Sequence, residues 1–123
     1  MQGTRFTVAV HLHSTLAADA QGAFQLPCPA SLMEISAVAS NDSDATLQVG
    51  TSADADGIMT AATIGDSNTP AIKGPAQFDG ALADAANPVH LADNTIVTWV
   101  LDHDGSTGTA AAHVDIVFTF TEG

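Results

Sequence analysis

The sequence predicts an all-β protein, a single jelly-roll-like β-sandwich of about eight antiparallel strands that spans residues 1–123. Two observations predict it. Apolar and polar side chains alternate with a period of two in several short segments, as they do in strands with one buried face. Clusters of Gly, Pro, Asn, Asp and Ser separate these segments at the spacing of a sandwich or barrel, and no segment has the 3.6-residue period of a helix.

The expected strands run from a clear first segment to a clear last one. Apolar residues occupy every second position from Phe6 to Leu12 and again from Val114 to Phe120. First and last strands this regular commonly lie inside a sheet, whereas a proline such as Pro70 fits an edge strand. In chain order, the expected strands are 6–13, 23–26, 32–40, 45–51, 58–64, 70–74, 89–92, 95–103 and 109–121.

Three segments predict finer detail. Residues 17–22 are small and polar, which favours a loop before the second strand. The third strand is expected to place every second residue from Met33 to Ala39 on one face. Residues 79–86 are rich in alanine and lack a clear breaker, so one or two helical turns are expected there.

The charge balance excludes two classes of partner. Fourteen acidic residues stand against two basic ones, Arg5 and Lys73, for a formal net charge of −12. Nucleic-acid binding depends on Lys and Arg to displace counterions, and an anionic membrane would repel this chain. No apolar stretch approaches the ~20 residues of a membrane-spanning helix. We therefore expect neither a nucleic-acid nor a membrane partner.

One acidic turn has part of a calcium-loop pattern. In the run from Ser52 to Gly57, Asp54 and Asp56 lie at alternate positions and a glycine follows them. A calcium loop of this kind closes with a glutamate at its twelfth position, which here is Thr63, and it lies between helices rather than strands. The sequence thus favours a solvated turn, with a calcium site as the alternative.

His11 and His13 form a second candidate metal pair. Side chains alternate along a strand, so both imidazoles point to the same face, and such a pair can hold two coordination positions of a zinc ion. A third ligand would come from His90, His103 or His113, among which the sequence does not choose. The favoured interpretation is a polar or intersubunit face, without a metal.

No constellation predicts catalysis. Asp102, His103 and Ser106 contain the residue types of a catalytic triad, but the glycine-flanked, strained turn that usually presents a nucleophilic serine is missing. Trp99, the single tryptophan, could stack on a sugar, although its apolar strand favours a core or interface position. We expect no enzyme and no cofactor. The expected core or interface anchors are Phe24, Leu26, Leu32, Met33 and Trp99.

Three segments carry a resemblance to a known family. They are Val49–Ile58, a strand that enters the acidic turn; Phe24–Pro27, ahead of the third strand; and Val114–Gly123, the final strand. Together they resemble the small capsid decoration (cement) proteins of tailed bacteriophages, in their trimeric jelly-roll form. The resemblance implies a homotrimer on the capsid surface of a virion, bound to the major capsid protein and stabilising the shell, with no catalytic residues.

Two other classes of function remain open at this stage. A phage fibre, spike or carbohydrate-binding β-sandwich would show exposed aromatic residues on one face. An enzyme would need a metal site built on His11 and His13.

Overall fold

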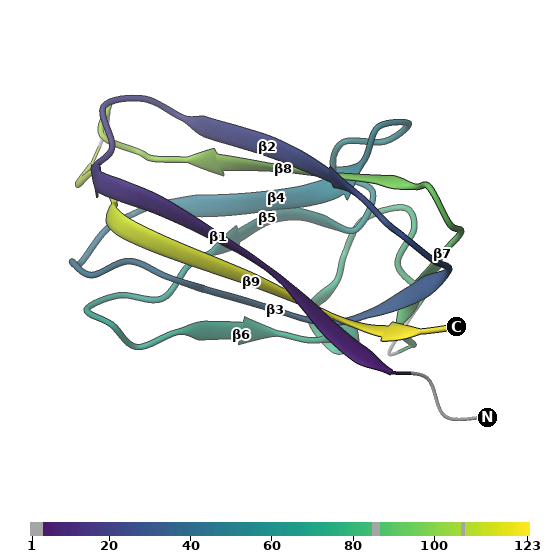
Figure 1. Cartoon of the computed structure of the whole chain (residues 1–123). Helices are drawn as coiled ribbons and strands as arrows, with labels where there is room; N and C mark the ends of the chain where they lie inside the picture. The colour runs from purple at the N-terminus through teal and green to yellow at the C-terminus, as the bar shows by residue number, and fades with distance from the viewer. Residues whose placement is uncertain (1–3, 85–86, 107) are drawn as a thin grey trace.

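The computed structural model describes residues 4–84, 87–106 and 108–123, and over these ranges the chain is built almost entirely of strands (Figure 1). One short 3-10 helix, η1, interrupts them. The elements are β1 (Arg5–Thr15), β2 (Ala20–Gln25), β3 (Ala30–Val38), β4 (Thr46–Thr51), β5 (Met59–Thr63), β6 (Ala71–Lys73), η1 (Pro75–Gln77), β7 (Val89–Leu91), β8 (Ile96–Asp102) and β9 (Ala112–Glu122).

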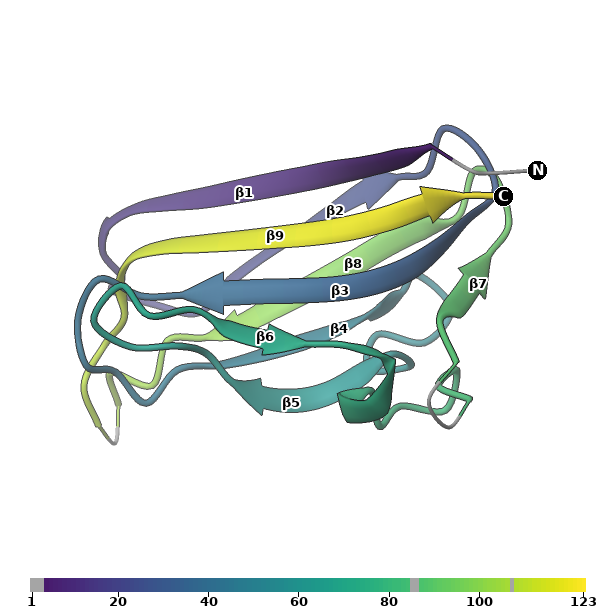
Figure 2. The same cartoon turned by 90° about the horizontal axis from the view of Figure 1, so that it is seen from below.

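The strands form two antiparallel sheets that face each other. One sheet has the order β1-β9-β3-β6, with β7 also paired to β3, and the other has the order β2-β8-β4-β5. The first two strands of the chain thus lie beside the last two, β1 against β9 and β2 against β8 (Figures 1 and 2). Consecutive strands alternate between the layers except at β4–β5 and β6–β7, where both strands lie in the same sheet. This is the double Greek-key connectivity of a jelly roll. The predicted all-β jelly-roll-like sandwich is confirmed.

The core lies between the two sheets and follows from the alternation in the sequence. Phe118 and Phe120 of β9 are fully buried, as are Leu32 of β3 and Leu47 of β4. At roughly 25 cal/mol per Å² of apolar surface, each such side chain contributes about 2–3 kcal/mol of transfer free energy on burial. The inward faces of the two middle strand pairs therefore supply most of the stabilising burial.

Two local predictions were wrong in the first half of the chain. The expected loop 17–22 ends early, because β2 already begins at Ala20 and pairs with Leu101 of β8. Met33 does not share the inner face with Ile35, because the pairing of β3 with β9 shifts register between Leu32 and Glu34. An extra residue in one strand reverses the alternation locally, and Met33 is consequently only half-buried.

The prediction of helical turns at 79–86 was also wrong over its described part. Residues 79–84 contain a turn but no helix. Residues 85 and 86 of that prediction lie outside the described residues. Backbone bonds explain the difference: Gly80 donates to the Ile58 carbonyl at 3.0 Å, and Leu82 to the Gly57 carbonyl. These two N–H groups bond to an adjacent segment of the same chain, so they are not available for the hydrogen bonds of a helix.

The prediction of which strands lie inside a sheet and which lie at an edge was partly right. β9 lies inside its sheet and the short β6 lies at an edge, as expected, but β1 is an edge strand despite its regular alternation. Alternation reports that one face is buried and carries no information on how many neighbours a strand has.

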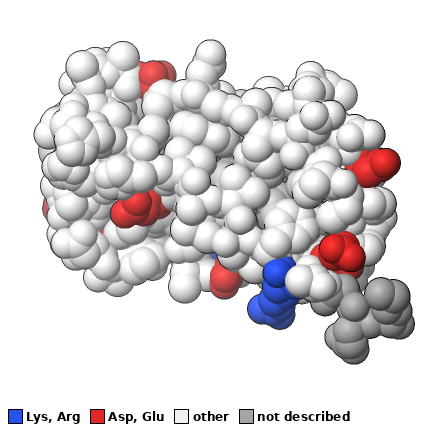
Figure 3. All heavy atoms as spheres, in the orientation of Figure 1, with Lys and Arg blue, Asp and Glu red and all other residues white. Residues whose placement is uncertain are grey.

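The acidic residues lie mainly in the connections between strands. The exceptions are Glu34, Asp102, Asp115 and Glu122, which lie within strands. The face shown in Figure 3 is largely uncharged, and the acids visible on it are separate from one another. Within the described residues, no helix is long and apolar enough to cross a membrane.

Candidate functional site

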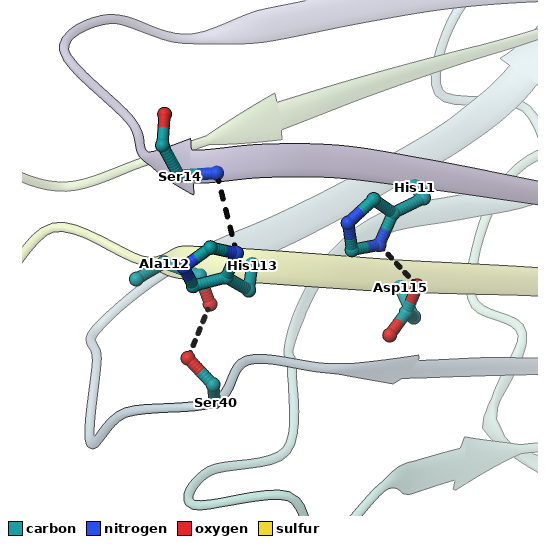
Figure 4. A network of polar contacts seen from close by, with 6 residues as sticks. All are labelled: His11, Ser14, Ser40, Ala112, His113 and Asp115. Atoms are coloured by element: carbon teal, nitrogen blue, oxygen red, sulfur yellow. Dashed lines mark hydrogen bonds and ion pairs between the residues drawn. The ribbon is translucent and has the colours of Figure 1, made fainter.

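Three histidines gather at one end of the five-stranded sheet. His11 and His13 point outward from β1, and His113 points outward from the start of the adjacent strand β9. Figure 4 shows His11 and His113 with their hydrogen-bond partners. One ring nitrogen from each of the three lies within 4.8 Å of the others, and all three residues are exposed. The sequence had suggested His11 and His13 as a pair, and the fold selects His113 as their third member.

The histidines have defined hydrogen-bond partners. His11 Nδ1 lies 2.6 Å from Asp115 Oδ1, directly across the β1–β9 pair. The backbone N–H of Ser14 donates to Nδ1 of His113 over 3.3 Å. His13 and His113 meet edge-on, with ring centroids 5.4 Å apart. The cluster is thus an exposed patch of imidazoles with one carboxylate beside it.

A bulge in the backbone brings the cluster together. The β1–β9 register shifts between Leu12 and Thr15, so two residues of β1 oppose His113. Ser14 and His113 both adopt left-handed backbone conformations, with φ of 60° and 48°. Non-glycine residues in this region cost of order 1 kcal/mol each, and such strain concentrates at functional sites.

A second group combines Asp19, Asp102 and His103. Asp19 Oδ1 accepts the backbone N–H of His103 at 3.0 Å and lies 2.8 Å from its Nδ1. These bonds from His103 lower the pKa of Asp19 below its usual value. The contacts join the β1–β2 connection to the residue that follows β8.

The acidic turn from Ser52 to Gly57 uses its oxygens internally. The Asp54 carbonyl accepts the backbone N–H groups of Thr51 and Gly57, at 2.9 and 3.0 Å. Asp54 and Asp56 are close enough that hydrogen bonding to Asp56 raises the pKa of Asp54. Within the described ranges, neither joins a third carboxylate or histidine in a metal-sized group.

The predicted anchors occupy two environments. Leu26 and Leu32 are fully buried and Trp99 is 5 % exposed, lying across Gly22 of β2. Phe24 is half-buried, like Met33, and packs on Phe118 with ring centroids 5.2 Å apart.

The half-buried inward side chains define what we call the open side. It consists of the inward faces of the edge strands β1 and β2, namely Phe6, Val8, Val10, Leu12 and Phe24. All five pack against the core, yet each remains partly exposed, because these strands have a neighbour on one side only. Figure 1 shows β1 and β2 along the same side of the sandwich.

A groove of about 470 Å³ lies over the outer face of the four-stranded sheet. Its floor includes Gln21, Ala23, Thr98 and Val100, and the turn after β4 forms one wall. Every lining residue is uncharged.

Comparison with known proteins extends this description. No protein-family model and no curated protein sequence matches the chain. Among solved structures, it is similar to a chain in the capsid of Ralstonia phage GP4, with TM-score 0.60 and 17 % identity over 100 % of this chain and 87 % of that chain. It is also similar to a chain in the cyanophage Pam1 capsid asymmetric unit, with TM-score 0.57 and 19 % identity over 99 % and 87 %. At these identities the likeness establishes a shared fold.

Sequence reasoning missed two features. The grouping of His113 with His11 and His13 depends on the pairing of the first strand with the last, which no local pattern encodes. The open side depends on which strands lie at edges. A weak signal for it does exist: residues 6–33 contain a single charged side chain, Asp19, in a chain with a net charge of −12.

Proposed function

We propose that this chain is a structural virion protein, a capsid decoration (cement) protein that binds the major capsid protein on the outside of a phage head and stabilises the shell. The observation that carries the proposal is the fold shared, over nearly the whole chain, with chains from two phage capsid structures. The resemblance of three sequence segments to decoration proteins supports the finer assignment.

The surface chemistry supports a binding role and not a catalytic one. Most of the acids lie in separate connections between strands, and the groove over the four-stranded sheet is lined by uncharged residues. A protein that must be soluble before it occupies many equivalent sites benefits from a strong net charge. We therefore infer that the chain is not an enzyme and needs no cofactor.

The open side supports self-association, and a homotrimer is the form we propose. Phe6, Val8, Val10 and Leu12 extend along β1, which is eleven residues long and has one side without a strand partner. A second copy packed there would bury apolar surface and cover an edge that otherwise invites aggregation. The uncharged character of 6–18 also minimises repulsion between acidic copies. A stable contact needs about 1,000 Å² of buried surface.

The carbohydrate-binding or fibre alternative has less support. Sugar-binding faces present aromatic rings, and Trp99 is only 5 % exposed. Within the described residues, the large apolar side chains that are well exposed are Ile72, Leu82 and Ile96, none of them aromatic.

Heat release of packaged DNA tests the proposal. Heads of the phage that encodes this chain would be stripped of it, and purified protein would be added back to half of them. Because bound protein favours the assembled shell by mass action, decorated heads should release DNA at a higher temperature. Equal release temperatures for bare and decorated heads would refute the stabilising role.

A further inference from the structure

We propose that His11, His13 and His113 bind one divalent transition-metal ion of the zinc class on the outer face of the five-stranded sheet. The proposal is independent of the capsid role. It concerns the group of three imidazoles on two neighbouring strands, of which Figure 4 shows His11 and His113.

The donor set selects the class of ion. Three imidazole nitrogens suit zinc, nickel or copper, whereas calcium and magnesium prefer oxygen ligands. Zinc–nitrogen bonds of about 2.0–2.1 Å place tetrahedral ligands roughly 3.3 Å apart. The three nitrogens already lie within 4.8 Å of one another on exposed side chains. Small rotations about the side-chain bonds therefore bring them to ligand spacing.

Asp115 prepares His11 for this role. An ionised carboxylate only accepts hydrogen bonds, so the 2.6 Å contact requires His11 Nδ1 to carry the proton. The lone pair of the neutral ring is then on Nε2, free to bind a metal. A carboxylate behind a metal-binding histidine fixes its tautomer and raises its basicity. Asp115 is thus a positioning residue.

His113 has the weaker restraint. Its Nδ1 accepts the Ser14 N–H over 3.3 Å, beyond the usual range of a strong N–H bond. Metal binding through Nδ1 would displace the Ser14 N–H and lose only this one long contact.

Metal binding would join β1 to β9 where their register is interrupted. Three protein ligands leave a fourth position of a tetrahedral ion for water. Only the folded chain can bind the metal at this site, because His113 is about a hundred residues away in sequence from His11 and His13. Zinc should accordingly raise the melting temperature of the folded protein.

The test is calorimetric titration of zinc into tag-free protein stripped of metal, at neutral pH. We expect one equivalent bound by the wild type, with a rise in melting temperature. His13→Ala and His113→Asn should each weaken binding by more than tenfold, because each removes a ligand. Asparagine is chosen at His113 because it tolerates the left-handed backbone there.

His90→Ala is the matched control. His90 is also exposed, but it lies on β7 beside Ser31, at the opposite end of the sheet. This variant should bind zinc like the wild type, and calcium or magnesium should produce no binding heat with either. Far-UV circular dichroism confirms that each variant is folded.

Three results would overturn the proposal. They are less than one equivalent of zinc on the wild type, unchanged affinity in folded His13→Ala, or an equal loss in His90→Ala. Asp115→Ala, which removes the acceptor, separates positioning from folding: affinity should fall about 10–100-fold. In this variant without metal, nitrogen NMR should show that His11 no longer keeps its proton on Nδ1, and an unchanged His11 spectrum would exclude the positioning role.

Discussion

The two long sides of the sandwich are built differently. On the side of β5 and β6, the segment after η1 crosses between the sheets, with Phe78 buried and Asp79 bonded to Thr60 of β5. Met59, the first residue of β5, and Ile64, the residue after its end, are 2 % and 3 % exposed. On the side of β1 and β2 no such segment crosses within the described residues, and the inward side chains of the open side stay half-buried.

This difference shows that the chain buries the apolar side chains on one side of the sandwich more completely than those on the other. A connection that doubles as a cover completes the core on one side, using residues that form neither strand nor helix. The other side ends in two edge strands whose apolar faces remain available. A small domain buries a limited fraction of its surface, so association is an economical way to complete such a core.

The largest expected effect comes from comparing a fully buried aromatic ring with one on the open side. Phe118 is fully buried, and Phe118→Ala should lower the free energy of unfolding by about 3–5 kcal/mol. Phe6 stacks on Phe120 at 5.2 Å but is half-buried, so Phe6→Ala should cost clearly less. Urea denaturation at low protein concentration measures both. Equal losses would mean that Phe6 is as fully packed as the core.

Gly22 tests whether the edge strand β2 is tightly packed. A Cβ at this position would lie 2.6 Å from Trp99 Cζ2, so Gly22→Ala forces the indole to move and should cost about 1–3 kcal/mol. Gly74→Ala is the matched control, because its nearest neighbour would be 3.6 Å away. The tryptophan fluorescence spectrum should shift in Gly22→Ala alone. If Gly22→Ala changed neither the spectrum nor the stability, the indole of Trp99 would not be tightly packed against β2.

Asp79 tests how much the segment after η1 contributes to stability on the side of β5 and β6. Its carboxylate accepts the N–H and the hydroxyl of Thr60, both at 2.9 Å, and Asp79→Ala should cost about 1 kcal/mol at neutral pH. Asp42→Ala, at an exposed turn, should have little effect.

The same contact predicts a pH dependence. The backbone N–H of Thr60 lowers the pKa of Asp79 below 3.8 in the folded state. The stabilisation is therefore full above the unfolded value and is lost as the pH falls through the lowered folded one. The difference between wild type and Asp79→Ala should shrink in acid, and a difference that grows in acid would contradict this.

The smallest expected effect on folding belongs to the open side. Val8→Thr together with Val10→Thr places two hydroxyls at half-buried positions that still reach solvent in a free monomer, so the free energy of unfolding should fall by about 1 kcal/mol or less. Association should weaken, because the hydroxyls would be buried against a partner. Val117→Thr, on the outer face of β9, should leave association unchanged. Light scattering after size-exclusion chromatography distinguishes these outcomes.

Much of the fold was predictable, because alternation from Phe6 to Leu12 and from Val114 to Phe120 marks an inner face without reference to the rest of the chain. Three features were not. The bulge at Met33 and the edge position of β1 depend on pairing partners, and the backbone bonds that remove Gly80 from a helix come from Gly57 and Ile58. The candidate metal site was half predictable: a strand's own period joins His11 to His13, whereas only the β1–β9 register adds His113.

The mass of the purified protein in solution tests most directly the claim that the open side is completed by further copies of the chain. Sedimentation equilibrium over a range of concentrations should give about three times the 12.4 kDa of one chain, and the Val8→Thr, Val10→Thr variant should shift toward 12.4 kDa. A wild-type mass of 12.4 kDa at every concentration would contradict the account.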